Sequence, residues 1–239
     1  MAILKDCLVV VVGGSSGMGL ATAKAALSDG ARVVITGRSA EKLAAANEVL
    51  GGRARTAVLE ITQEDSVAQL FSELGPVDHI LCTAGSPVAA KRLQVDSSLM
   101  RGAFDTRVMG DIFVAKHAAS RMRAGGSITF IVGVAAPRPY EGSAVTSAAC
   151  AAVEGLTRGL AVDLAPLRVN AIRPGYVDTE MIGEVLGEKK DEYLAAIAKK
   201  LLVRRIGRVE DIADAALFLM KNGYVTGITL TVDGGHVLV

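Results

Sequence analysis

The stretch VGGSSGMGLATAKAAL (residues 12–27) decides the fold of this chain of 239 residues. It follows the apolar run LVVVV (8–12) and places Gly13, Gly17 and Gly19 in a G-x-x-x-G-x-G spacing ahead of an Ala-rich segment. Glycines at such places allow a tight turn and a close approach of the backbone to a ligand. The first turn of a following helix presents unpaired N–H groups to a phosphate. The stretch therefore predicts a strand, a phosphate-binding turn and a helix.

Short β-branched runs alternate with helical segments along the whole chain, with no linker or low-complexity segment between them. Near-continuous apolar runs are typical of parallel strands that are covered on both faces. We therefore predict an α/β fold of Rossmann type, a single domain over residues 1–239 with a doubly wound parallel sheet of about seven strands and helices on both faces. The predicted strands are 8–12, 32–36, 55–59, 79–82, 127–132, 168–172 and 228–231.

Two of the predicted helices have candidate N-caps. Ser39 precedes AEKLAAANEVL (40–50), and Thr62 precedes QEDSVAQLFSEL (63–74). Hydroxyl side chains at such positions accept a hydrogen bond from a free N–H group of the first turn. We expect both hydroxyls to cap their helices.

Charge, hydropathy and cysteine content exclude several classes of protein. The formal net charge is +1 with no long run of like charge, so we expect no nucleic-acid partner. No apolar run reaches the roughly 18 residues that span a bilayer, and the start MAILKD lacks a signal-peptide pattern, so we expect a cytoplasmic protein without a membrane partner. Cys7, Cys82 and Cys150 are odd in number and lie in separate apolar segments, which predicts neither disulfides nor a metal site.

The end of the second predicted strand indicates which dinucleotide is bound. The sequence VVITGRSAEK (33–42) places Gly37, Arg38 and Ser39 where a site for NAD has an acidic side chain on the ribose 2′-hydroxyl. A guanidinium can instead bind a 2′-phosphate with two hydrogen bonds. We therefore predict NADP(H) as the cofactor, the alternative being that Arg38 is a solvated loop cation.

Several motifs, taken in their order along the chain, resemble the short-chain dehydrogenase/reductase family. They are GGSSGMG (13–19), HILCTAGS (79–86), AAVEGLTRGLAVDLAPLRVNAIRPGYVDTEM (151–181), GRVEDIADAALFLM (207–220) and GYVTGITLTVDGG (223–235). The resemblance places Glu60 and Ile61 at the adenine edge and Val177 and Thr179 at the nicotinamide carboxamide. The complete set of cofactor-binding residues predicted in this way is Gly13, Ser15, Ser16, Gly17, Met18, Gly19, Gly37, Arg38, Ser39, Glu60, Ile61, Thr83, Ala84, Gly85, Pro174, Gly175, Val177 and Thr179.

The family's catalytic residues have no counterparts in this chain. Aligning VGVAAPRPYEGSAVTSAACAAVEGLT (132–157) with the family's Ser and Tyr-x-x-x-Lys pattern needs no gap and places Gly133 at the serine, Thr146 at the tyrosine and Cys150 at the lysine. The family's Asn falls on Arg107. An aliphatic hydroxyl is a poor acid at neutral pH, and a thiol is no fixed positive charge. The sequence therefore leaves the catalytic residues unknown.

Arg107 and Tyr140 are the candidates for catalysis that remain. Arg107 could stabilise developing negative charge, or it could be the ion-pair partner of Asp105 or Asp111. Tyr140, in a loop before Thr146, could deliver a proton, or it could be a surface aromatic.

Three further residues depart from the family pattern near the cofactor loop. Val12 replaces the family's Thr, and Cys82 and Thr83 replace two Asn residues. We expect these changes to remove a supporting polar contact between neighbouring strands, without preventing cofactor binding.

Three functions remain open. The first is an NADP(H)-dependent oxidoreductase with an unusual catalytic site, which exchanges hydride with a small activated carbonyl, imine or quinone-like substrate. The second is an inactive NADP(H)-binding sensor or scaffold, and the third is a non-redox enzyme on the same fold. The first is favoured because the nicotinamide segment RPGYVDT (173–179) is complete.

Three other regions carry weaker signals. Residues 181–202 match the family's substrate-covering region, so they form a lid or an ordinary amphipathic helix. Ala148, Ala149 and Ala152 would permit close helix packing, and the family resemblance implies a homodimer or homotetramer. The histidines at 79, 117 and 236 receive no functional role.

Overall fold

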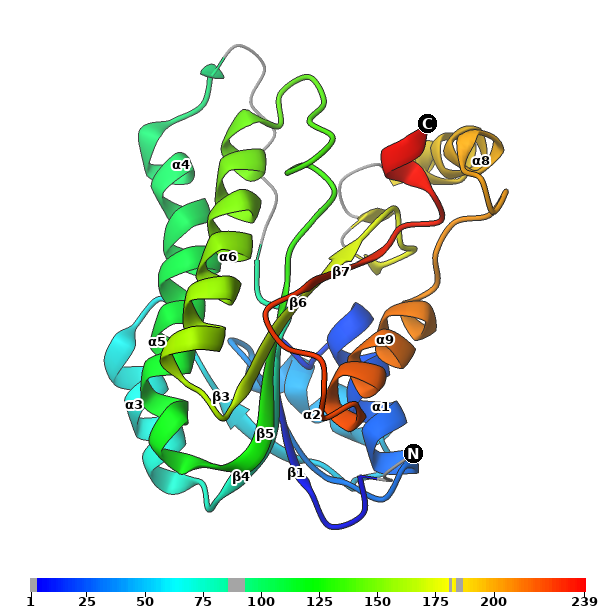
Figure 1. Cartoon of the computed structure of the whole chain (residues 1–239). Helices are drawn as coiled ribbons and strands as arrows, with labels where there is room; N and C mark the ends of the chain where they lie inside the picture. Colours follow the sequence, from blue (N-terminus) through cyan, green and yellow to red (C-terminus); the bar gives the residue numbers. More distant parts are fainter. Residues whose placement is uncertain (1–3, 86–92, 181, 184–186) are drawn as a thin grey trace.

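Seven parallel strands form one sheet in the order β3-β2-β1-β4-β5-β6-β7, as Figure 1 shows. The computed structural model describes residues 4–85, 93–180, 182–183 and 187–239. The strands are β1 (Leu8–Val12), β2 (Arg32–Gly37), β3 (Arg55–Val58), β4 (Val77–Cys82), β5 (Met122–Ile131), β6 (Arg168–Pro174) and β7 (Thr229–Val232). This sheet confirms the predicted Rossmann-type fold, whose order reverses between β1 and β4.

The described helices lie between the strands along the chain, as in other α/β folds. They are α1 (Gly17–Ser28), α2 (Ala40–Val49), α3 (Glu64–Glu73), α4 (Ser97–Phe104), α5 (Gly110–Ala118), α6 (Ala144–Asp163), α8 (Lys190–Lys200) and α9 (Val209–Lys221). A π-helical turn spans Asp105–Met109, and single 3-10 turns span Ala119–Arg121, Gly187–Lys189 and His236–Leu238. Met181 and residues 184–186 of the predicted lid region lie outside the described residues.

The sheet lies between two helical layers, with α1, α2 and α9 on one face and α3, α5 and α6 on the other (Figure 1). The position of β1 inside the sheet, between β2 and β4, explains why its sequence is apolar throughout. Val9 and Val11 pack into one core, whereas Val10 and Val12 pack into the other. Alternate side chains of a strand point to opposite faces, so a strand covered on both sides has no polar face.

Of the two predicted helix caps, one is confirmed and one is wrong. The Oγ atom of Ser39 accepts a hydrogen bond from the Lys42 N–H at 3.2 Å, at the start of α2. Thr62 does not cap α3, which begins at Glu64. Its hydroxyl donates instead to Oε1 of Glu60 at 2.8 Å, because that carboxylate lies only two residues away and is the stronger acceptor.

Within the part of the chain that the structure describes, no helix is both long enough and apolar enough to cross a bilayer. The same residues contain no group of three or more His, Cys, Asp or Glu side chains placed to hold a metal ion. Cys7, Cys82 and Cys150 are all free thiols.

We expect Phe130→Ala to lower the free energy of unfolding by about 3–5 kcal/mol, which is the usual effect of truncating a buried phenylalanine. Phe130 lies on β5 with no exposed side-chain surface, so the truncation leaves a cavity between the sheet and its helices. Urea unfolding measures the change. The control is Val162→Ala at a residue that is 78% exposed, where we expect a change within about 0.5 kcal/mol. Equal effects at the two sites would contradict the packing described for β5.

Candidate functional site

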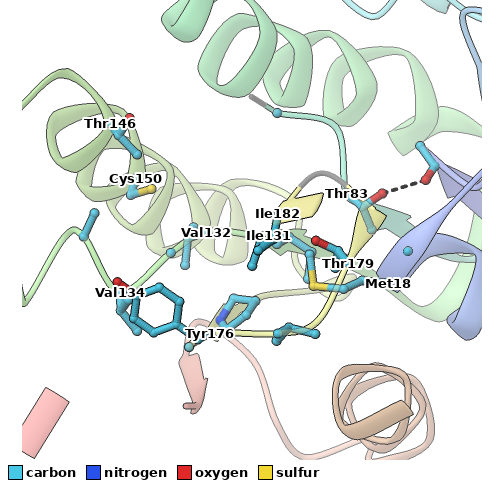
Figure 2. A pocket seen from close by; sticks show the side chains of 18 of the residues that line it. Met18, Thr83, Ile131, Val132, Val134, Thr146, Cys150, Tyr176, Thr179 and Ile182 are labelled. Atoms are coloured by element: carbon cyan, nitrogen blue, oxygen red, sulfur yellow. Dashed lines mark hydrogen bonds between the residues drawn. The ribbon is translucent and has the colours of Figure 1, made fainter. Parts of the chain in front are cut away.

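A cavity of about 320 Å³ lies at the carboxyl ends of the strands, next to the point where the strand order reverses. Its walls come from the loops after β1, β4, β5 and β6 and from α6. Figure 2 shows Thr146 and Cys150 on the α6 side, Met18 and Thr83 on the opposite side, and Val132 between them. Ligands of doubly wound sheets bind at this place.

The cavity brings together the two ends of the predicted cofactor site. The predicted residues that line it are Gly13, Ser16, Gly17, Met18, Gly19, Thr83, Gly85, Pro174, Gly175, Val177 and Thr179. Those that lie outside its walls are Ser15, Gly37, Arg38, Ser39, Glu60, Ile61 and Ala84. Ser86, from the quoted motif, lies outside the described residues. The cavity thus corresponds to the phosphate and nicotinamide portion of the predicted site, and the adenosine portion lies beyond it.

The glycine loop is shaped for a close backbone approach. A Cβ atom added to Gly19 would lie 2.2 Å from the Gly13 carbonyl oxygen, a distance that no side chain can tolerate. Helix α1 begins at Gly17, and Ser16 before it forms no side-chain hydrogen bond that caps the helix. The first-turn N–H groups and the positive end of the helix dipole therefore remain available to an anion in the cavity. These features fit the pyrophosphate of a dinucleotide.

Thr83 preserves a contact that we expected to be lost. Its hydroxyl lies 3.0 Å from the Val12 carbonyl oxygen and 2.9 Å from that of Gly13, and it donates to both. The hydroxyl thereby links the end of β4 to the glycine loop (Figure 2). The expectation that these replacements leave the neighbouring strands without a supporting polar contact is wrong, because the Thr83 hydroxyl reaches backbone oxygens at the end of β1.

Arg38 and Glu60 follow neighbouring strands at the adenosine end of the predicted site. Arg38 is exposed, and it has no hydrogen bond or ion pair with any described residue. Oε1 of Glu60 accepts hydrogen bonds from the N–H and the hydroxyl of Thr62, so this carboxylate is bound within its own loop. The side chain of Ile61 is buried against Gly110. Of these groups, only Arg38 presents an unpaired charge.

Arg107 is a buried cation in the wall of the cavity. It lies on the π-helical turn that separates α4 from α5, a distortion that often occurs at functional sites. Its Nη1 donates to the Ile131 carbonyl oxygen at 3.2 Å, and a Cβ added to Gly85 would lie 2.8 Å from its guanidinium carbon. It forms no ion pair with Asp105 or Asp111, so neither of the ion pairs considered from the sequence is present.

Asp111 forms no ion pair with Arg107, and the burial of its carboxyl group favours the uncharged form. Asp111 is 2% exposed, and burial raises its pKa well above the usual range, although Arg107 and a hydrogen bond with Cys82 oppose the change. Burial likewise raises the pKa of the Cys82 thiol. The positive charge of Arg107 is thus available to a ligand that carries or develops negative charge.

We expect Asp111→Asn to remove a pH dependence from the stability of this protein. The pKa of Asp111 is higher in the folded state than in the unfolded state, so between the two values only the folded chain holds this proton. The contribution to stability is complete at acidic pH and is lost as the pH rises through the folded pKa, at about 1.4 kcal/mol per pH unit. Urea unfolding of both proteins at pH 5, 6 and 7 measures this difference.

The matched control is Asp105→Asn, which changes an exposed carboxyl group on the π-helical turn that precedes α5. We expect Asp105→Asn to keep the pH slope of the unsubstituted protein. An Asp111→Asn protein with the same slope would contradict the raised pKa of Asp111.

The catalytic end of the cavity contains small, uncharged groups. Gly133, Thr146 and Cys150 all line it, and a Cβ added to Gly133 would lie 3.4 Å from the Cys150 Sγ. Burial raises the pKa of the Cys150 thiol, so that it stays protonated. Tyr140 also lines the cavity while half of its surface is exposed, and burial raises the pKa of its phenol. No described residue of the lining is a lysine.

Sequence reasoning missed two aromatic residues of this site, Tyr176 and His236. Both line the cavity, with ring centroids 4.9 Å apart. Tyr176 could have been found, because it directly follows Pro174 and Gly175 of the nicotinamide segment. His236 gave no such signal, since it is isolated in the sequence near the C-terminal end and reaches the cavity only through the fold.

Comparisons with known proteins agree with this geometry. A family model described as Enoyl-(Acyl carrier protein) reductase matches residues 12–236. Short-chain dehydrogenase/reductase ucsE of an Acremonium species is 36% identical over 98% of this chain and 97% of its own.

Two solved structures share the fold over nearly their whole length. The MalC Reductase/Diels-Alderase of Malbranchea aurantiaca superposes with a TM-score of 0.94 at 30% identity, covering 99% of this chain and 98% of that one. A small-chain dehydrogenase in complex with NADPH superposes with a TM-score of 0.86 at 34% identity, covering 98% of this chain and 100% of that one. From these similarities and the geometry above, the chain belongs to the short-chain dehydrogenase/reductase family.

Proposed function

We propose that this chain is an NADP(H)-dependent oxidoreductase that exchanges hydride with a small activated carbonyl, imine or quinone-like substrate, without the family's tyrosine and lysine. The observation that carries the proposal is one cavity that is lined by the glycine loop, by Pro174 and Gly175, and by the buried cation Arg107. A cofactor held by the glycine loop and by Pro174 and Gly175 would meet a substrate beside Arg107.

The residues present fit a phosphorylated nicotinamide nucleotide. Gly17 and the following first-turn N–H groups of α1 would hold the pyrophosphate. Arg38, exposed and unpaired within the described residues, would bind the 2′-phosphate, and Thr179 would hold the carboxamide. The similar dehydrogenase in complex with NADPH supports the same choice of cofactor. When bound, the nicotinamide would supply or accept the hydride.

The chain's own residues would lower the barrier by positioning and by charge. Holding the two reactants in contact is worth effective molarities of about 10⁵ M or more, whereas positioned acid–base catalysis contributes about 10²- to 10⁴-fold. Hydride transfer therefore survives the loss of the family's tyrosine when the hydride acceptor is already activated. Arg107 would stabilise the negative charge that develops on a carbonyl or quinone oxygen.

Two experiments test the proposal in order. Calorimetric titration with NADPH and NADP⁺ tests binding, and a protein that binds neither would refute the whole assignment. Single-turnover mixing with NADPH and a panel of quinones, imines and enones, followed at the nicotinamide absorbance, then tests hydride transfer. Oxidation above a cofactor-only blank supports the enzyme. Tight binding without oxidation across the panel would favour the sensor or scaffold, to which the small, uncharged residues at the catalytic end give some support.

The proposal includes a homodimer or homotetramer that pairs through α6. Ala148 is exposed and Ala152 is partly exposed on this helix, so both are available for close packing. Ala149 is 1% exposed and belongs to the core, so its expected place on this packing face is wrong. Light scattering at micromolar concentration should give a multiple of the 24.7 kDa chain, and a monomer would count against the pairing.

A further inference from the structure

His236 lines the cavity and lacks the hydrogen bonds that a buried imidazole normally makes. It is 9% exposed, and its Nδ1 is fully enclosed without a partner. Its Nε2 has no hydrogen bond to any described residue either. Buried polar side chains are nearly always paired, and those left unpaired in native structures often belong to binding or catalytic sites. The Nε2 atom is the ring nitrogen that is not enclosed, so it is the one that a ligand in the cavity would contact.

The fold fixes this ring in place from two sides. The carboxylate of Asp233 accepts hydrogen bonds from the N–H groups of Gly235 at 2.9 Å and Val237 at 2.8 Å, which closes the turn that carries His236. On the other side, the ring of Tyr176 contacts the imidazole, and its hydroxyl is hydrogen-bonded to Tyr193 at 3.0 Å. An imidazole that is held in place in this way, and whose nitrogens have no hydrogen bond to any described residue, is preorganised for a ligand.

Its location relative to the proposed cofactor is also favourable. Tyr176 directly follows Pro174 and Gly175, the turn against which the nicotinamide would lie. Since the Tyr176 ring touches the imidazole, His236 borders the region where a substrate would meet the reactive carbon.

We propose that His236 exchanges the proton with the substrate's oxygen, in the role that the family gives to its tyrosine. This inference rests on the proposed function. In the oxidative direction, the imidazole nitrogen takes the hydroxyl proton while the carbinol carbon gives its hydride to the oxidised nicotinamide, and the C–O bond becomes C=O. In the reductive direction, the imidazolium returns the proton to the oxygen as the hydride arrives at the carbon.

The groups around His236 suit this role. Burial lowers its pKa, the Arg138 guanidinium lowers it further, and Asp233 opposes both. Tyr176, packed against the ring, remains an uncharged phenol because burial and its bond to Tyr193 raise its pKa. The neutral imidazole is therefore the resting base, and its protonated form is a stronger acid than an ordinary imidazolium.

Tyr140 is the less suitable donor in the same cavity. Burial, Tyr193 and Cys150 all raise the pKa of its phenol, and among the described residues no cation is a cause that lowers it. A phenol needs a nearby positive charge to act as an acid near neutral pH, and the described part of the chain does not supply one that lowers the pKa of Tyr140.

Imidazole NMR tests the contact without requiring turnover. The chain has only three histidines, so ¹⁵N-histidine labelling gives three sets of ring signals, and His236→Gln identifies the relevant set. Menadione or cyclohexanone is added to the protein with NADP⁺, where no hydride is available. We expect the ring nitrogens of His236 to shift, while those of His117, which is bonded to Glu64 on the surface, stay unchanged. The methyl signal of Met18 reports occupancy of the cavity.

The outcomes separate the two proposals. A shift of Met18 without a shift of His236 would overturn the role of His236, whereas no shift of either with both probes would contradict the substrate assignment and the inference built on it. A shift of both supports both.

Kinetics distinguish a proton-transferring His236 from a merely structural one. A carbonyl must be protonated after hydride transfer, whereas an iminium ion becomes a neutral amine by hydride transfer alone. We expect His236→Gln and His236→Phe to lower kcat by about 10²- to 10⁴-fold with a ketone, but by less than about tenfold with an iminium. With the ketone, kcat should fall as the pH rises above the pKa of His236, and this dependence should vanish in His236→Phe.

The control variant is His117→Gln, which makes the same substitution on α5 outside the cavity and should leave both activities unchanged. Equal losses of kcat with ketone and iminium, or no loss with either, would reject proton transfer by His236. If the unsubstituted protein reduces neither class, the proposed function fails and the NMR result alone decides whether His236 binds carbonyl ligands.

Discussion

Arg38→Asp should raise the Kd for NADPH by about 100-fold while leaving the Kd for NADH unchanged or lower. A hydrogen bond to a charged group contributes about 1.5–3 kcal/mol, and a carboxylate placed beside a 2′-phosphate adds repulsion. The same carboxylate can accept a hydrogen bond from the 2′-hydroxyl of NADH, which is how sites for NAD are built. Arg38 is exposed and unpaired within the described residues, so its replacement disturbs no other contact of those residues.

Isothermal calorimetry with NADPH and NADH measures both constants. Arg121→Asp, at an exposed arginine in the turn after α5, is the control for the change in net charge and should alter neither constant beyond about twofold. An Arg38→Asp protein that binds NADPH as tightly as before would show that Arg38 is only a solvated loop cation. The choice of cofactor would then need another explanation.

The parts of the fold that local sequence controls were predictable. Strand β1 occupies the predicted residues because an unbroken run of valines can only be buried on both faces. Strand β5 begins at Met122, earlier than predicted, because Met122 pairs with Val77, and the register shifts across Gly125 and Gly126 before Ser127 pairs with His79. Glycine is unfavourable in an isolated strand, but the neighbouring strand supplies hydrogen bonds that no local pattern reveals.

Some residues of the candidate site were likewise predictable from the local sequence, and others were not. The glycine loop was predictable, since the spacing of its glycines is typical of a tight turn whose backbone approaches a phosphate. The turn with Pro174 and Gly175 was found only through the family resemblance. His236 was missed because Tyr176, the ring against which it packs, follows β6 whereas His236 follows β7, so only the tertiary structure places the two rings together. The raised pKa of Asp111 was also hidden, because it follows from burial rather than from neighbours in sequence.

Arg107→Leu should lower kcat by about 10²- to 10³-fold with quinone or ketone substrates, while the Kd for NADPH changes little. Removing one donor that faces developing negative charge has an effect of this size in other enzymes. Arg107 is suited to that role because its guanidinium lies in the cavity wall, donates to the Ile131 carbonyl oxygen, and forms no ion pair with a described carboxylate. Single-turnover oxidation of NADPH measures kcat, and Arg101→Leu on the exposed side of α4 is the control.

The sign of this effect depends on the charge of the substrate, which makes Arg107→Leu a test of the substrate class. A quinone or ketone gains negative charge as hydride arrives, so a buried cation stabilises its transition state more than its ground state. An iminium ion loses positive charge, and the cation of Arg107 repels it from the start. With an iminium the variant should therefore keep its activity or gain some. Arg107→Lys retains the positive charge but lacks the planar guanidinium. Its kcat with ketones should therefore lie between those of the unsubstituted protein and of Arg107→Leu. If Arg107→Leu unfolds at the same urea concentration as the unsubstituted protein yet loses activity equally with both substrate classes, Arg107 shapes the cavity and does not stabilise charge.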